Sequence, residues 1–98
     1  MILVRDVFQI KFGKMKDALA AWKEIGNTFD ATSRAQRRLL TDLVGKYYTL
    51  VLESTFESLD EWENFGRTTM ANDQWRKRYQ DAAAFIESGH REIFNIVS

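Results

Sequence analysis

The sequence predicts an α+β fold in which a four-stranded antiparallel sheet carries its helices on one face. Strand-like alternation and helix-like spacing of apolar residues follow one another in the order β-α-β-β-α-β. The 98 residues are enough for one core, and we expect a single domain over residues 1–98. With 45% hydrophobic and 29% charged residues, the composition is typical of a globular chain.

The first predicted strand covers residues 2–12, where apolar and polar side chains alternate. Its apolar face is interrupted only by Asp6 and consists of Ile2, Val4, Phe8, Ile10 and Phe12. After Gly13 the spacing changes to steps of three and four, which is typical of an amphipathic helix. The apolar stripe of this helix is Met15, Leu19, Trp22, Ile25 and Phe29. The polar residues 30–33 fix its C-terminal end only to within several residues.

Two further strands are predicted over residues 37–44 and 46–56. The second of them is rich in good β formers, such as Tyr47, Tyr48 and Val51. Gly45-Lys46 between the strands predicts a tight hairpin, because glycine readily adopts the positive φ that such turns require.

The second helix is predicted to begin at a capping box, in which Ser58 accepts from the Glu61 amide and Glu61 reaches back. We expect Gly66 to interrupt this helix and Asn72 to cap a second segment. The buried side of the two segments is expected to be Leu59, Trp62, Phe65, Trp75, Tyr79, Ala82, Ala83 and Ile86. Gly89 then ends the helix, and residues 91–97 form the last strand.

This order of elements, with the second helix broken, predicts the split βαβ, ferredoxin-like arrangement. Both helices then cover one face of the sheet, while the other face carries Leu3, Val7 and Val51 among polar residues. An open antiparallel face can be solvated. Its apolar side chains nevertheless favour pairing with a second sheet, and a two-fold homodimer is the simplest such assembly.

Several stretches resemble a known superfamily: the opening strand that runs into Gly13-Lys14, the segment LESTFESLDEW at residues 52–62, and Trp75 ahead of the closing segment REIF at residues 91–94. On these features the chain resembles the dimeric α/β-barrel superfamily, and within it NIPSNAP-like and antibiotic-biosynthesis-monooxygenase-like proteins. The resemblance covers nearly the whole chain and implies that two sheets pack into a barrel. The superfamily includes cofactor-free oxygenases, haem-degrading enzymes and many proteins without assigned activity.

Asp6 is the best marker of a pocket. A carboxylate that faces the helices must be paired, protonated or beside a water-filled cavity, unless a local bulge turns it to solvent. The further candidates for a pocket are Tyr48, Ser54, Tyr79 and His90.

Arg5 and Glu53 lie on the mixed faces of two neighbouring strands, and the expected register sets them opposite one another. We expect a structural ion pair inside the barrel rather than a catalytic pair. The three tryptophans, Trp22, Trp62 and Trp75, fall on helical stripes and are expected in the core. The basic run at residues 33–38 is interpreted as a solvated connection.

No metal or cofactor is expected. One histidine and no cysteine exclude sites with several histidines or thiolates, although His90 alone could act as a general acid or base. In haem-degrading relatives a histidine on the second helix ligates the iron, and the resemblance places Tyr79 at the matching position. Tyrosine is a much rarer haem ligand than histidine, so haem is disfavoured.

The partners expected are a second copy of the chain and a small apolar or aromatic ligand. Zero net charge argues against binding to nucleic acid or to a membrane surface, and the absence of a signal peptide or membrane-spanning segment predicts a cytoplasmic protein. Two functions remain open: a ligand-binding module without assignable activity, and a cofactor-free monooxygenase or related enzyme that acts on an aromatic or polyketide-like substrate. Whether the protein is an enzyme stays open at this stage.

Overall fold

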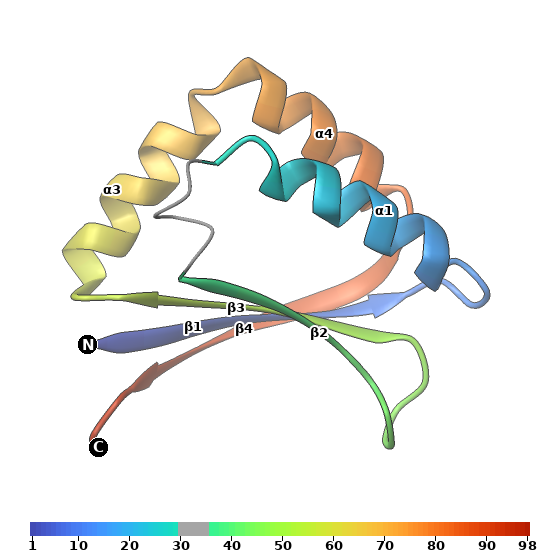
Figure 1. Cartoon of the computed structure of the whole chain (residues 1–98), viewed down its shortest axis with the longest axis horizontal. Coiled ribbons are helices and arrows are strands. Elements are labelled where there is room, and N and C mark those ends of the chain that lie inside the picture. The colour runs from blue at the N-terminus through green and yellow to red at the C-terminus, as the bar shows by residue number, and fades with distance from the viewer. Residues whose placement is uncertain (30–35) are drawn as a thin grey trace.

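The computed structural model describes residues 1–29 and 36–98, and it confirms the ferredoxin-like α+β fold. The four strands form one antiparallel sheet in the order β2-β3-β1-β4. The helices of the described residues, α1, α3 and α4, all cover the same face of this sheet (Figure 1). The elements are β1 (Ile2–Ile10), α1 (Met15–Gly26), β2 (Arg37–Thr41), β3 (Thr49–Phe56), α3 (Leu59–Met70), α4 (Asp73–Ala83) and β4 (Ile86–Asn95).

The alternation of β1 determines which side chains lie under the helices. Ile2, Val4 and Ile10 are buried there, and Asp6 has the same parity, so it lies on the helix-covered face. Most of the buried apolar residues within 1–29 and 36–98 form two clusters. One cluster packs around Trp22 of α1, and the other packs Ile2, Val4 and Phe56 against Trp62 and Phe65 of α3.

The predicted break in the second helix is present, but it lies at residues 71–72 and not at Gly66. α3 runs through Gly66 to Met70, because a single glycine costs a helix only about 1 kcal/mol. Asn72 caps α4, and its side chain accepts from the Trp75 amide at 3.1 Å. Ser58 likewise accepts from the Glu61 amide at 3.2 Å, while the Glu61 carboxylate reaches the amide of Glu57.

The tight hairpin predicted at Gly45-Lys46 is wrong, since β2 ends at Thr41 and β3 begins at Thr49. The loop is closed by Asp42, whose carboxylate accepts from the Thr49 amide at 3.0 Å and whose own amide donates to the Thr49 carbonyl. Asp42 therefore replaces the turn residues in fixing the register. Leu43 and Val44 are left exposed at the tip of the loop.

The last strand is also longer than predicted. α4 ends at Ala83, and β4 passes through Gly89, which pairs with Phe8 of β1. A Cβ at Gly89 would lie 2.9 Å from Phe8 Cδ1, so this glycine makes room for the Phe8 ring instead of ending a helix. β1 itself ends at Ile10, two residues before the predicted end.

Candidate functional site

A cleft of about 980 Å³ lies between the sheet and the helices. Its floor is formed by β1 and β3, including Asp6 and Ser54, and residues on both sides of the helix break, such as Met70 and Trp75, form its roof. α3 and α4 meet at an angle above the sheet (Figure 1). The break at residues 71–72 therefore shapes the space below it.

Aromatic rings line the cleft in two groups. Towards α1 and α4, the rings of Phe8 and Trp22 stack with centroids 5.1 Å apart, and those of Trp75 and Tyr79 stack at 5.0 Å. Towards α3, Phe65 packs against Phe29 and Phe56, with centroids 5.4 Å apart in both pairs. The cleft thus offers flat apolar surface at both of its ends.

Asp6 is the carboxylate at the floor of the cleft, and it is paired. Nε of Arg91 on β4 donates to Asp6 Oδ1 at 2.5 Å, and Nη2 donates to Oδ2 at 3.4 Å. The hydrogen bond to Asp6 raises the pKa of Arg91 above its ordinary value. The same guanidinium lies over the Trp62 ring, 5.2 Å from its centroid. The Asp6 charge is therefore compensated from the edge strand β4.

A second guanidinium enters the cleft from β2. The Arg37 guanidinium carbon lies 4.5 Å from the centroid of Phe29 and 5.5 Å from that of Phe65. Burial lowers the pKa of Arg37, and the charge of Asp6 acts in the opposite direction. The positive charge of Arg37 is thus held in an apolar setting, within electrostatic reach of the same carboxylate.

The structure brings together three of the five predicted pocket residues, Asp6, Ser54 and Tyr79, which border the cleft from its helix-covered side. His90 touches the rim of the cleft, but the register aligns it with Val7 on the opposite face of the sheet. Tyr48 lies elsewhere. It has a positive φ of 57° immediately before β3, and its ring packs edge-on against Phe12.

Sequence reasoning missed the two arginines of the cleft. Arg37 belongs to the basic run at residues 33–38, which was interpreted as solvated; residues 33–35 lie outside the described residues, but Arg37 itself is partly buried against aromatic rings. Arg91 could have been found only by pairing β4 with β1, because this pairing sets Arg91 directly opposite Asp6. Of the tryptophans, Trp22 is in the core as expected, whereas Trp62 and Trp75 are only half-buried and line the cleft.

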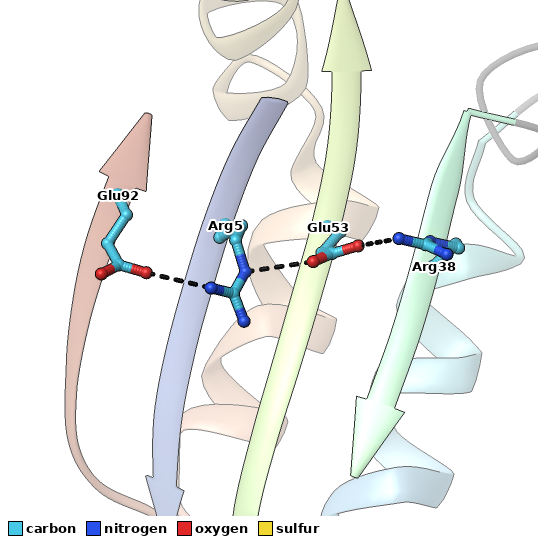
Figure 2. A network of polar contacts seen from close by, with 4 residues as sticks. All are labelled: Arg5, Arg38, Glu53 and Glu92. Atoms are coloured by element: carbon cyan, nitrogen blue, oxygen red, sulfur yellow. Dashed lines mark hydrogen bonds and ion pairs between the residues drawn. The ribbon is translucent and has the colours of Figure 1, made fainter. Parts of the chain in front are cut away.

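The open face of the sheet carries a row of four alternating charges that crosses all four strands (Figure 2). Arg5 Nε lies 3.0 Å from Glu53 Oε2, and Arg5 Nη1 donates to Glu92 Oε1 at 3.3 Å. Arg38 of β2 contacts the other oxygen of Glu53. The Nε atom of Arg5 is buried without hydrogen-bond geometry, so its contact with Glu53 is an ion pair only. We name these four residues the charge row.

The residues described hold no group of three or more His, Asp or Glu side chains that could bind a metal ion. Within the same ranges, 1–29 and 36–98, every helix is too short or too polar to cross a membrane.

No protein-family model and no curated protein matches the sequence. Solved structures do match it. A NIPSNAP family protein from Agrobacterium tumefaciens superposes with a TM-score of 0.87 at 18% identity, covering 98% of this chain and 85% of that one. An uncharacterized NIPSNAP domain protein from Burkholderia xenovorans gives 0.84 at 15% identity, over 100% and 96%.

A putative antibiotic biosynthesis monooxygenase from Nitrosomonas europaea superposes with a TM-score of 0.74 at 10% identity, and both chains are covered completely. The NIPSNAP protein from Burkholderia xenovorans is itself described as uncharacterized. At these identities the likeness establishes the fold. It confirms the resemblance drawn from the sequence: the chain has the fold of NIPSNAP and antibiotic-biosynthesis-monooxygenase-like proteins.

Proposed function

We propose that the protein is a small-ligand-binding module whose cleft takes an apolar or aromatic ligand. The observation that carries this proposal is the aromatic lining of a concave space of about 980 Å³. Small-molecule sites are typically clefts of roughly 300–1,000 Å³ with apolar walls and a few polar groups. The Asp6–Arg91 pair and Arg37 are the polar groups at the floor and side of this cleft.

A matched pair of variants on α4 and its cap tests this proposal. Ala83 lines the cleft, whereas the adjacent Ala84 does not border it. Calorimetric titration with a neutral aromatic probe, 2-naphthamide, should give saturable one-to-one binding to the native chain. Ala83→Phe should weaken this binding at least tenfold, because its ring occupies part of the cleft, and Ala84→Phe should leave it unchanged. Equal effects of the two variants would overturn the proposal.

We further propose that the open face pairs with a second copy of the chain, so that the charge row lies between two sheets. Phe94 remains 45% exposed on this side, and Leu3, Val7 and Leu40 lie on it with polar neighbours. Exposed apolar side chains on an extended sheet face are typical of an interaction surface. A two-fold axis lets one surface cover its equivalent.

The charge row supports this pairing because its order is self-complementary. From β2 to β4 the signs run plus, minus, plus, minus, for Arg38, Glu53, Arg5 and Glu92. A two-fold axis that runs parallel to the strands, between β1 and β3, reverses the order in the second copy. Every cation then faces an anion, whereas an axis across the strands would set like charges face to face. Light scattering at micromolar concentration should give twice the chain mass, and a monomer mass would contradict the proposal.

The second candidate function is a cofactor-free monooxygenase or a related small-molecule enzyme. One observation favours it: the cleft reaches Asp6, the only carboxylate on its floor among the described residues, in a fold shared with a putative monooxygenase. Both Asp6 oxygens are engaged by Arg91, which leaves this carboxylate poorly placed to accept a proton from a substrate. We therefore rank binding above catalysis. Oxygen consumption with activated phenols that is abolished in Asp6→Asn would reverse this order.

A further inference from the structure

We propose that the ligand of the cleft is an aromatic monoanion, such as an aryl carboxylate, whose charged group lies between Arg37 and Arg91. This inference rests on the proposed function, because it names the chemical class of ligand for the same cleft. It follows from three features of the cleft: the balance of charge, the free donor atoms and the position of the rings.

The balance of charge in the cleft is positive. Among the described residues the acidic side chains that border it are Asp6 and Glu63, against four arginines. One of these, Arg76, is paired with Asp73 on its own helix, which leaves Arg37, Arg67 and Arg91. At the floor the single carboxylate, Asp6, is already bound to Arg91. A cationic ligand would have to displace that arginine, whereas an anionic ligand adds the compensating charge that this apolar setting lacks.

Within residues 1–29 and 36–98, the Arg37 guanidinium forms no hydrogen bond, and Arg91 has donors beyond the two that Asp6 uses. A guanidinium has five N–H donors in one plane. Asp6 uses Nε and Nη2 of Arg91, which leaves Nη1. Arg37 lies over the Phe29 ring, which covers a face of its guanidinium while the N–H bonds point along the plane of the group. Burial lowers the pKa of Arg37, and a bound anion would offset that cost.

The aromatic rings indicate the rest of the ligand. Along β1, Asp6 lies between Phe8, which stacks on Trp22 of the first ring group, and Ile2, which pairs with Phe56 of the second. Arg91 is bound to Asp6, and Arg37 lies over the rings of the second group. An anionic group bound at the arginines therefore has flat apolar surface beside it. Rings stack favourably on such surface, which favours an aryl group over a flexible alkyl chain.

The test compares probes of one shape and three charges by calorimetric titration: 2-naphthoate, neutral 2-naphthamide and cationic 2-naphthylmethylammonium. We expect 2-naphthoate to bind about tenfold or more tightly than the amide, as a hydrogen bond to a charged group provides. Arg37→Gln should reduce the ratio of naphthoate affinity to amide affinity to about one, with both affinities measured on the same variant. The matched control is Arg38→Gln, since Arg38 is the next residue but contacts Glu53 on the opposite face.

The outcomes distinguish a failure of the anion proposal from a failure of the proposed ligand-binding function. Equal affinity for naphthoate and amide, or an undiminished preference in Arg37→Gln, overturns the anion proposal and leaves ligand binding in place. Tighter binding of the cation also overturns it and identifies Asp6 as the group that receives the ligand. If none of the three probes binds, the proposed function fails together with this inference. Loss of the preference in both Arg37→Gln and Arg38→Gln would also overturn it, because the effect would then not be specific to the cleft.

Discussion

Arg5 and Asp6 are neighbours in β1, yet they lie on opposite faces of the sheet and take part in two different kinds of ion pairing. On the open face, Arg5 is one member of the charge row, where each inner residue contacts two partners. On the helix-covered face, Asp6 has one cationic partner among the described residues, Arg91, in a cleft walled by rings. The charge row compensates itself, whereas the cleft keeps an excess of positive charge.

The two proposals require this difference of β1: one of its faces belongs to the proposed dimer surface and the other to the proposed binding cleft. The period of two in β1 separates the side chains, so a change on one face leaves the other face in place. Of the two inner members of the charge row, Arg5 has a side chain 32% exposed and Glu53 one only 9% exposed, which suits a fixed structural role for Glu53. In the cleft, the Arg91 side chain is 52% exposed and can move towards a ligand.

The largest loss of stability should come from a substitution in the packed core under the helices, and a smaller loss from the matching substitution at the cleft. Trp22 is only 6% exposed and packs in the main core, whereas Trp62 is half-buried at the cleft. Trp22→Ala should therefore lower the free energy of unfolding by about 3–5 kcal/mol. Trp62→Ala should cost about half as much, because part of its surface is already in contact with solvent. Urea denaturation measures both, and equal losses would show that the cleft is as tightly packed as the core.

The next largest loss of stability is expected from substitutions in the charge row. Arg5→Met and Glu53→Leu should each lower the free energy of unfolding by about 2–3 kcal/mol and weaken the proposed dimer. Arg5→Met leaves the nearly buried Glu53 with one partner, and Glu53→Leu leaves the partly buried Arg5 with one. The double variant should recover much of the loss. Arg76→Gln, which removes the exposed pair with Asp73, is the control and should change stability by less than about 0.5 kcal/mol. Strictly additive losses in the double-mutant cycle would show that the pair is not coupled.

A smaller effect is expected where β4 meets β1 under the helices. Gly89→Ala should lower the free energy of unfolding by about 1–2 kcal/mol, because the new methyl group must displace the Phe8 ring from its stack on Trp22. Gly66→Ala is the control, since a Cβ there meets no atom within 4 Å. Thermal melts should show a loss only at Gly89. A neutral result would mean that the ring moves freely, and that the floor of the cleft is adaptable.

The fold could be predicted because its signals are local. The alternation in β1, the stripe of α1 and the caps at Ser58 and Asn72 each depend on residues within one element. Errors occurred where a distant contact decided the outcome. Gly89 was interpreted as a helix end, but its role is set by the Phe8 ring of another strand. The β2–β3 loop is closed by a side chain, Asp42, and not by the glycine within it.

The candidate site was predictable in part for the same reason. Asp6 was identified because a carboxylate breaks the apolar face of its own strand. Its partner Arg91 is 85 residues away along the chain and looks like an ordinary surface arginine until β1 and β4 are paired. Arg37 was hidden in a basic run, since composition cannot show that an aromatic ring from α3 and another from the segment after α1 will cover one of its members.

The smallest expected effect on stability is also the sharpest test of the comparison between the two faces. Asp6→Asn removes the negative charge from the floor of the cleft and leaves a side chain of nearly the same shape. Because its partner Arg91 is half-exposed, the free energy of unfolding should fall by no more than about 1 kcal/mol. The affinity for 2-naphthoate should rise several-fold, since Arg91 is released to bind the anion.

Glu53→Gln is the counterpart on the open face, and it should behave in the opposite way. Glu53 is nearly buried and contacts two arginines, so losing its charge should cost more stability than Asp6→Asn does. The affinity for 2-naphthoate should not change, because Glu53 lies across the sheet from the cleft. Titrations and urea denaturation should therefore rank the two variants in opposite order: Asp6→Asn changes the affinity more, and Glu53→Gln changes the stability more. If Glu53→Gln raised the affinity as much as Asp6→Asn, net charge rather than the local cleft would control binding, and the two faces would not be independent.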